Sequence, residues 1–459
     1  MPSEDLAALF LSIRDALVAR GTWRVDWGED AEVRNIAEEV EAAIVDDDLG
    51  AVLADFYRHL TSDGRSEYAI LLGLDRALAR IHPLRRRRRD PIPAALQPLH
   101  TQVTLTGRLN EHANDGHLLF RHAEPESPAT QFDLDRQFHS VVWVPAAATR
   151  DCVVRAFRSR YDITVAGSTL KVGCAPVVGH LEEMSVRVTG RSPRYYSIEI
   201  DADRAPWAER IAAILTEADR SGADVLLLPE VTTNPALVQQ WQAEVRKPIA
   251  PRRTRLKWIV AGTGPADIGD PPFNRAWVID RRSGARLFEQ DKIVPYTMEA
   301  RTVESWGLVG LFGGPGDAYE AMSRGQSTTI AEASAGRFAI LICQDLSEIL
   351  DVGARVRDAD VSVVLVPVFD SELSAERWHH DKAKELRQAA GSRVVVSNSL
   401  AIARHADPTA AGRPVTTSLV EHPAGLGGVA YRDLPLLATA TSPTSLAVFD
   451  VPVHKLLVD

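Results

Sequence analysis

Cysteine is scarce in this chain of 459 residues, which contains only Cys152, Cys174 and Cys343. None of them has a cysteine or histidine partner at the spacing of a zinc site, and three scattered thiols are too few for a disulfide framework. We therefore expect a protein of a reducing compartment, held together without disulfides or a structural metal.

Long apolar runs are also missing, so the sequence predicts no membrane-spanning segment. The opening stretch, MPSEDLAALFLSIRDALVAR, carries acidic residues where a secretory signal carries bases. Both features favour a cytoplasmic protein that does not associate with membranes.

An excess of basic residues is absent as well. The 62 acidic and 52 basic residues give a formal net charge of -10, which argues against nucleic acid or an anionic membrane as the main partner. The local exception is the arginine run RRRRR at residues 85–89, which prolines bracket on both sides. Such a run is typical of a solvated linker, and contact with a polyanion is the alternative.

The length of the chain and its hydrophobic content of 45% predict more than one folded domain. Apolar residues recur at helical spacing through residues 1–90, which predicts a helical accessory segment. Residues 91–190 contain short β-like stretches between polar and Gly/Pro turns, which predicts a β-rich accessory segment. From residue 191 to residue 459 strand-like and helix-like stretches alternate, as in YYSIEID, WAERIAAILTEADRSG and ADVLLLP, and this is typical of one large α/β domain.

Three ionisable residues occur where strand-like stretches of the α/β domain end. Glu230 ends ADVLLLPE, Lys292 follows RAWVIDRRSGARLFEQDK, and Cys343 ends FAILIC. Side chains at strand ends often form active sites in α/β folds, because the sheet holds them rigidly while loops admit a substrate. Taken singly, each has an ordinary explanation, since Glu230 could cap a turn, Lys292 could be a surface charge and Cys343 could be a core residue.

Taken together, these segments resemble the carbon-nitrogen hydrolases of the nitrilase superfamily, which use a glutamate, a lysine and a cysteine in this chain order. The resemblance covers residues 191–459 and rests on GADVLLLPE, FNRAWVIDRRSGARLFEQDKIVPY and FAILICQDL. It implies an αββα sandwich in which Glu230, Lys292 and Cys343 converge at one end, without a metal or other cofactor. It also implies a homodimer or higher homo-oligomer, formed by pairing of helix layers.

The chemistry of these residue types fits that resemblance. Cys343 would attack a carbonyl or nitrile carbon, Glu230 would accept the thiol proton and later protonate the leaving amine, and water would cleave the acyl thioester. Partial burial would raise the pKa of Glu230 toward a useful value. Lys292 would supply positive charge near the oxyanion. The stretch QDLSEIL predicts a helix start after the cysteine, where the Gln344 amide would bind the oxyanion and the helix dipole would lower the thiol pKa.

Two further predictions concern residues around this triad. The resemblance implies a second glutamate shortly after the lysine, for which Glu299 in KIVPYTMEA is the better match and Glu304 the weaker one. The adjacent His379 and His380 would face different directions on a predicted helix, so a shared metal site is not expected and surface positions are the preferred interpretation.

The sequence thus predicts a thiol-dependent hydrolase that acts on a small-molecule amide or related non-peptide C–N bond. An amide-forming acyltransferase would use the same thioester and differ only in what attacks it. A sensor or regulatory protein built on this domain is the third alternative, with residues 1–190 transmitting the signal. Retention of all three triad residues favours an enzyme.

Overall fold

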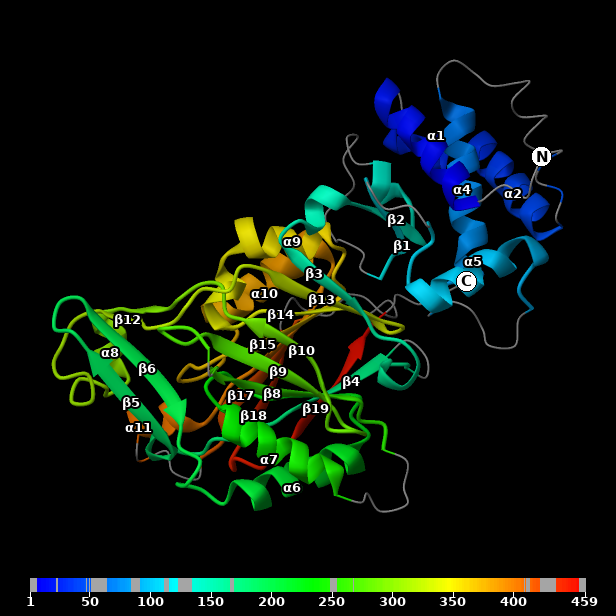
Figure 1. Ribbon diagram of the computed structural model, residues 1–459. Coiled ribbons are helices and arrows are strands. Elements are labelled where there is room, and N and C mark those ends of the chain that lie inside the picture. Colours follow the sequence, from blue (N-terminus) through cyan, green and yellow to red (C-terminus); the bar gives the residue numbers. More distant parts are fainter. Residues whose placement is uncertain are drawn as a thin grey trace. The chain divides into compact units, whose positions relative to one another are not determined.

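The computed structural model divides the chain into two compact units (Figure 1). The first comprises residues 1–150 together with 358–360, and the second comprises residues 151–357 and 361–459. The predicted linker at residues 85–89 lies outside the described residues. The structure describes residues 6–21, 24–46, 48, 50, 64–83, 91–110, 115–122, 134–165, 169–247, 254–266, 268–407, 409, 413–421 and 435–453.

The described part of the first unit is a group of helices with a small antiparallel sheet. Its central helix, α4, has the sequence RSEYAILLGLDRALA, which is buried on nearly every side, and helices α1 and α2 pack against it. The carboxylate of Asp75 on α4 accepts hydrogen bonds from the backbone N–H groups of Ser140 (2.8 Å) and Val141 (3.0 Å), which joins the helices to the sheet. The regular elements are α1 (Leu6–Arg20), α2 (Ala31–Val45), α4 (Arg65–Ala79), α5 (Gln97–Thr106), β1 (Gly116–Phe120) and β2 (Val141–Pro145).

Helices α2 and α4 approach each other closely at Gly73, and this contact gives a test of the first unit. A Cβ added at Gly73 would lie 2.7 Å from both the Ala37 carbonyl oxygen and the Val40 Cβ. We therefore expect Gly73→Ala to lower the unfolding free energy by about 1–3 kcal/mol, because the two helices must separate. Gly310→Ala is the control, since its Cβ would meet no atom within 4 Å. Urea unfolding followed by far-UV circular dichroism measures the difference, and equal midpoints for the two variants would contradict the prediction.

The described residues of the second unit form two large mixed sheets and one smaller sheet. The six-stranded sheet has the order β10-β9-β8-β7-β4-β19, the seven-stranded sheet β18-β17-β16-β15-β14-β13-β3, and the four-stranded sheet β11-β12-β6-β5. The bounds of these strands are β3 (Cys152–Ala156), β4 (Thr169–Cys174), β5 (Met184–Thr189), β6 (Arg194–Ile200), β7 (Val225–Leu227), β8 (Trp258–Pro265), β9 (Asn274–Asp280), β10 (Arg286–Asp291), β11 (Thr297–Met298), β12 (Ala318–Glu320), β13 (Thr328–Ala333), β14 (Gly336–Ile340), β15 (Val363–Pro367), β16 (Arg393–Ser397), β17 (Val415–Glu421), β18 (Leu436–Ala440) and β19 (Ala447–Pro452).

The two large sheets pack face to face. Trp258 of β8 contacts Phe338 of β14, with ring centroids 5.2 Å apart, and the Ser397 hydroxyl of β16 donates to the Leu227 carbonyl oxygen of β7 at 3.3 Å. The central strands are buried along their whole length, which is why VLL and VVLVP read as continuous apolar runs rather than alternating ones.

Helices cover the outer faces of this sandwich (Figure 1). Helices α6 and α7 lie on one side and α9 and α10 on the other, so the layer order is helix, sheet, sheet, helix. The predicted αββα sandwich is confirmed. The helices are α6 (Trp207–Ser221), α7 (Pro235–Arg246), α8 (Ala300–Ser305), α9 (Ala354–Asp358), α10 (Trp378–Ala390) and α11 (Ala401–Ala406).

The boundary expected at residue 190 lies at residues 150/151 instead. Strand β3 pairs with β13, and β4 lies between β7 and β19, so residues 151–190 supply strands to the sandwich itself. From the sequence these short strands look like part of a separate accessory segment, because the strands with which they pair are distant along the chain. Cys152 and Cys174 therefore belong to the second unit.

The described helices include none that is both long and apolar enough to cross a lipid bilayer.

Candidate active site

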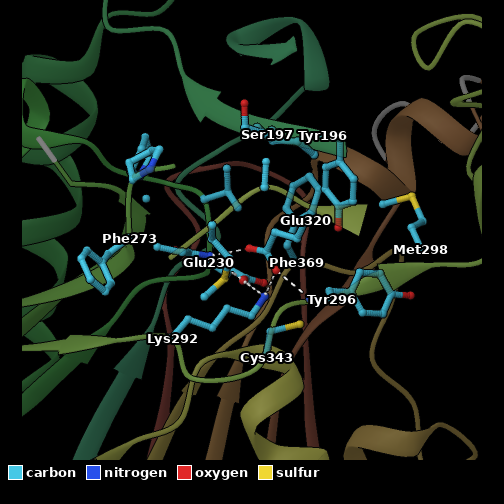
Figure 2. Close-up of a pocket in the computed structure, with 18 of the residues that line it drawn as sticks. Tyr196, Ser197, Glu230, Phe273, Lys292, Tyr296, Met298, Glu320, Cys343 and Phe369 are labelled. Atoms are coloured by element: carbon cyan, nitrogen blue, oxygen red, sulfur yellow. Dashed lines mark hydrogen bonds and ion pairs between the residues drawn. The ribbon is translucent and has the colours of Figure 1, made fainter. Parts of the chain in front are cut away.

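Glu230, Lys292 and Cys343 converge in a pocket of the second unit (Figure 2). The Lys292 ammonium lies 2.8 Å from Glu230 Oε1, and the Glu230 carboxyl is close enough to the Cys343 thiol to affect its pKa. All three side chains are buried, although they come from positions far apart in the sequence. The structure thus brings together the three residues that the sequence singled out at strand ends.

Glu230 lies just after strand β7, in a turn that backbone hydrogen bonds hold in place. Its backbone N–H donates to the Val368 carbonyl oxygen (3.2 Å), and Thr232 N donates to the Thr263 carbonyl oxygen (2.9 Å). Between them Val231 has a φ of 55°, a left-handed conformation that is costly for a β-branched residue. The surrounding hydrogen bonds hold the turn in this conformation, which fixes the carboxylate of Glu230.

Cys343 also has a left-handed backbone, with a φ of 49°. The carboxylate of Asp345 holds the turn by accepting hydrogen bonds from the N–H groups of Ile342 (3.1 Å), Ile293 (3.0 Å) and Val294 (2.8 Å). Because Ile293 and Val294 directly follow Lys292, Asp345 joins the cysteine turn to the lysine segment. Burial raises the pKa of Asp345 to about 7, while these backbone hydrogen bonds act to lower it.

The residues after Cys343 differ from the predicted α-helix start. Cys343–Ser347 form a 3-10 helix, followed by a π-turn at Ile349–Gly353 and only then by α9. Gln344 occupies the first turn, before the first helical hydrogen bond, and its side chain donates to the Ser347 hydroxyl (2.7 Å). Such a short helix provides little dipole.

The predicted lowering of the thiol pKa is therefore wrong. Burial and the neighbouring Glu230 carboxylate raise the pKa of Cys343 well above its ordinary value, and Lys292 and the N–H of Phe369 offset this only in part. The resting side chain is a neutral thiol. It needs a base to become a nucleophile.

The Glu230 carboxylate can act as that base, because the groups around it set its pKa. Burial raises the pKa of Glu230, Lys292 acts to lower it, and the Glu320 carboxylate raises it further. Burial alone would lower the pKa of Lys292, but the charges of Glu230 and Glu320 raise it well above its ordinary value. Lys292 therefore keeps its proton, while Glu230 has a higher proton affinity than an exposed carboxylate.

A second glutamate does occupy the site, but it is Glu320 of strand β12. Its carboxylate accepts hydrogen bonds from Lys292 Nζ (2.6 Å) and from the backbone N–H of Tyr296 (2.8 Å). Glu299 and Glu304 are exposed, at the start and within α8, and neither joins this cluster. No clear pattern in the sequence marks Glu320, because β12 is only three residues long and Glu320 lies farther beyond Lys292 than expected.

Asn274 connects the two carboxylates. Its side-chain amide donates to Glu230 Oε1 (3.0 Å) and to Glu320 Oε1 (3.1 Å). It opens strand β9, in the stretch FNRAW that also contributes to the resemblance. Lys292 and Asn274 thus give both glutamates fixed positions and fixed donors.

The pocket in front of the thiol is small, with a volume of about 50 Å³. Apart from the charged cluster its wall is mostly apolar and aromatic, which favours a small uncharged group next to the nucleophile. Residues that form this wall include Ile198, Phe273, Met298, Trp306, Met322 and Phe369.

His379 and His380 are buried on α10, so the preferred surface interpretation is wrong. Their rings point to different carboxylates, His379 to Asp370 (3.3 Å) and His380 to Glu421 (3.5 Å). Burial lowers the pKa of His379 to about 4, so this ring is neutral at physiological pH. Among the described residues, no three potential metal-ligating side chains form a group that could hold an ion.

Comparisons with known proteins give structural likeness only. No family model matches the sequence, and a search of curated proteins finds no match. An amidase from Nesterenkonia sp. shares 18% identity over 65% of this chain and 95% of its own, with a TM-score of 0.39. Nit3 of Saccharomyces cerevisiae, described as a member of branch 10 of the nitrilase superfamily, shares 14% identity over 64% of this chain and 92% of its own, with a TM-score of 0.38. A glutamine-dependent NAD+ synthetase from Acinetobacter baumannii shares 14% identity over 61% of this chain and 45% of its own, with a TM-score of 0.38.

Proposed function

We propose that this chain is a thiol-dependent hydrolase of small-molecule amides and related non-peptide C–N bonds, acting through an acyl thioester at Cys343. The observation that carries the proposal is the buried contact of one carboxylate, Glu230, with both a thiol and an ammonium group. A thiol, a base with raised proton affinity and a fixed positive charge are what acyl transfer from an amide requires.

In the first step the Cys343 sulfur attacks the amide carbon while Glu230 accepts the thiol proton. The raised pKa of Glu230 makes it a stronger base than an exposed carboxylate, and its place beside the thiol in the buried pocket allows it to take the proton. As the new C–S bond forms, the electron pair of the C=O π bond moves to the oxygen, which becomes an oxyanion. Protonated Lys292 stabilises that oxyanion, and the N–H of Gln344 is the second proposed donor.

In the second step the tetrahedral intermediate collapses and the C–N bond breaks. Glu230 returns its proton to the departing nitrogen, so ammonia or an amine leaves and Cys343 holds the acyl group as a thioester. In the third step Glu230 deprotonates a water molecule that attacks the thioester carbon. The C–S bond breaks, the thiol regains its proton and the carboxylic acid is released.

The pocket suggests which amides fit. Its small volume and apolar wall favour short acyl groups. The two glutamates outnumber the single lysine, so a substrate with a free carboxylate beside the reacting carbon is disfavoured by charge repulsion.

The proposal predicts a trapped acyl enzyme and a transferable acyl group. With short aliphatic amides we expect ammonia release, and with added hydroxylamine we expect hydroxamate, because any good nucleophile can replace water at the thioester. Intact-mass spectrometry should show a mass increase equal to one acyl group on Cys343 after a rapid quench. Turnover only in the presence of an amine would indicate the acyltransferase alternative. Binding without turnover of amides, nitriles or N-carbamoyl compounds would indicate the sensor alternative and overturn the proposal.

The homo-oligomer and the cytoplasmic location implied by the sequence stay predictions of that sequence. They are not needed for the chemistry above, because all the residues that it uses come from one chain.

A further inference from the structure

One wall of the pocket is the inner face of the four-stranded sheet β11-β12-β6-β5. Strands β6 and β12 run parallel, with Tyr196 in register with Glu320 and Tyr195 in register with Tyr319. Side chains alternate between the faces of a strand, so Tyr196 and Glu320 face the pocket. Tyr195 and Tyr319 lie on the outer face, where their ring centroids are 6.1 Å apart. Tyr196 is therefore built into the same wall as the second glutamate.

The Tyr196 side chain is buried, with 5% of its surface exposed, and its ring stacks on Phe312 at a centroid distance of 5.3 Å. Among the residues that the structure describes, none forms a hydrogen bond with its hydroxyl. A hydroxyl that reaches a pocket from a buried ring and has no protein partner indicates a group that a ligand can satisfy.

Figure 2 shows the Tyr196 ring entering from β6 with its hydroxyl pointing into the pocket, on the opposite side from Cys343. Burial, and next the Glu320 charge, raise the pKa of Tyr196 well above its ordinary value, so the phenol stays protonated. It can therefore donate a hydrogen bond at neutral pH.

The polar atoms of the reacting amide already have partners in the proposed mechanism. Lys292 and the N–H of Gln344 stabilise the amide oxygen, and Glu230 protonates the amide nitrogen. The rest of the pocket wall is mostly apolar, with Ile198 on the same strand as Tyr196 and Met298 on the same sheet, although Ser197 and Tyr296 also line it. The Tyr196 hydroxyl is thus left for a polar atom in the part of the substrate that faces away from the thiol.

We propose that Tyr196 is a specificity-determining residue whose hydroxyl donates a hydrogen bond to an acceptor oxygen in the acyl part of the substrate. The inference rests on the proposed function and narrows its substrates to short amides that carry an ether, hydroxyl or carbonyl oxygen on the acyl chain. A purely aliphatic acyl group of the same size fills the space but leaves the buried phenol unpaired, and that loss reduces its kcat/KM.

Methoxyacetamide and butyramide test this, because they have the same size and differ in one oxygen. We expect wild-type protein to favour methoxyacetamide by about tenfold or more in kcat/KM. Tyr196→Phe keeps the ring on Phe312 and should reduce that ratio to about one, mainly by raising KM for methoxyacetamide. Tyr195→Phe is the matched control, since this neighbour on the same strand is 45% exposed on the other face, and it should leave the ratio unchanged.

Two kinetic results would overturn the inference. One is a wild-type ratio near one. The other is an equal loss on both amides in Tyr196→Phe, which would place the hydroxyl at the reacting amide instead. Thermal melting of each variant shows whether a loss comes from unfolding.

Binding separates this inference from the proposed function. In Cys343→Ala protein, titration calorimetry should show methoxyacetamide binding about tenfold more tightly than butyramide, and adding Tyr196→Phe should remove the difference. If wild-type protein hydrolyses neither amide but this binding preference is present, the hydrolase proposal fails and the role of Tyr196 stands. If neither amide is hydrolysed and no preference is found, both fail.

Discussion

Cys343→Ala protein is expected to lose amide turnover by about 10⁴-fold or more and to form no acyl adduct. The reason is that the covalent route disappears with the sulfur, and the remaining charges only polarise the substrate. The fold should persist, because alanine keeps the Cβ and therefore places the same demand on the left-handed backbone at this position. Steady-state ammonia release, intact mass after a rapid quench and thermal melting measure the three parts of this expectation.

Cys152→Ala is the control for the loss of a thiol as such. Cys152 lies on strand β3 and does not line the pocket, so its variant should keep turnover within about twofold of wild type. Turnover by Cys343→Ala within tenfold of wild type would remove the thioester mechanism. Equal losses in both cysteine variants would instead indicate a general effect on folding.

The sequence could predict the triad because each member ends or follows a recognisable strand. Runs such as ADVLLLP and FAILIC are apolar on both faces, as buried strands of a sandwich must be, and the polar residue after each run marks the edge where side chains meet. The structure shows that Glu230 and Cys343 also share a feature invisible in sequence. Each adjoins or occupies a left-handed backbone position at a non-glycine residue, and only tertiary hydrogen bonds hold it there.

The predictions from the sequence that the structure contradicts also have specific causes. Strands β3 and β4 appeared to belong to an accessory segment, because pairing between residues far apart in sequence leaves no local pattern. His379 and His380 appeared to be surface residues because histidine is polar, yet Asp370 and Glu421 provide carboxylates beside their buried rings. The expected thiol pKa had the wrong direction because burial and the Glu230 carboxylate, which only the folded site brings to the thiol, raise this pKa.

Substitutions of Glu320 and Glu299 test which residue is the second glutamate of the site. The sequence predicts Glu299, whereas the structure places Glu320 there. Glu320→Gln is expected to lower kcat/KM by roughly 10²–10³-fold, as for loss of a charge that organises an active site. Glutamine keeps the size of the side chain and can still contact Asn274 and the Tyr296 N–H. Lys292 keeps Glu230 as its ion-pair partner, so the variant should fold. Glu299→Gln should stay within about twofold of wild type, because Glu299 is exposed and outside the cluster.

The pH profile distinguishes a change in the base from a simple loss of packing. Activity requires ionised Glu230 in the free enzyme, so kcat/KM rises with pH through the pKa of that carboxyl. The Glu320 charge helps to raise this pKa, and removing it should therefore shift the acidic limb of the profile to lower pH. The same change makes Glu230 a weaker base and lowers the pKa of Lys292, so the plateau falls while the limb moves. A lower plateau with an unmoved limb would mean that Glu320 acts only by packing. A large loss in Glu299→Gln with none in Glu320→Gln would restore the assignment made from the sequence.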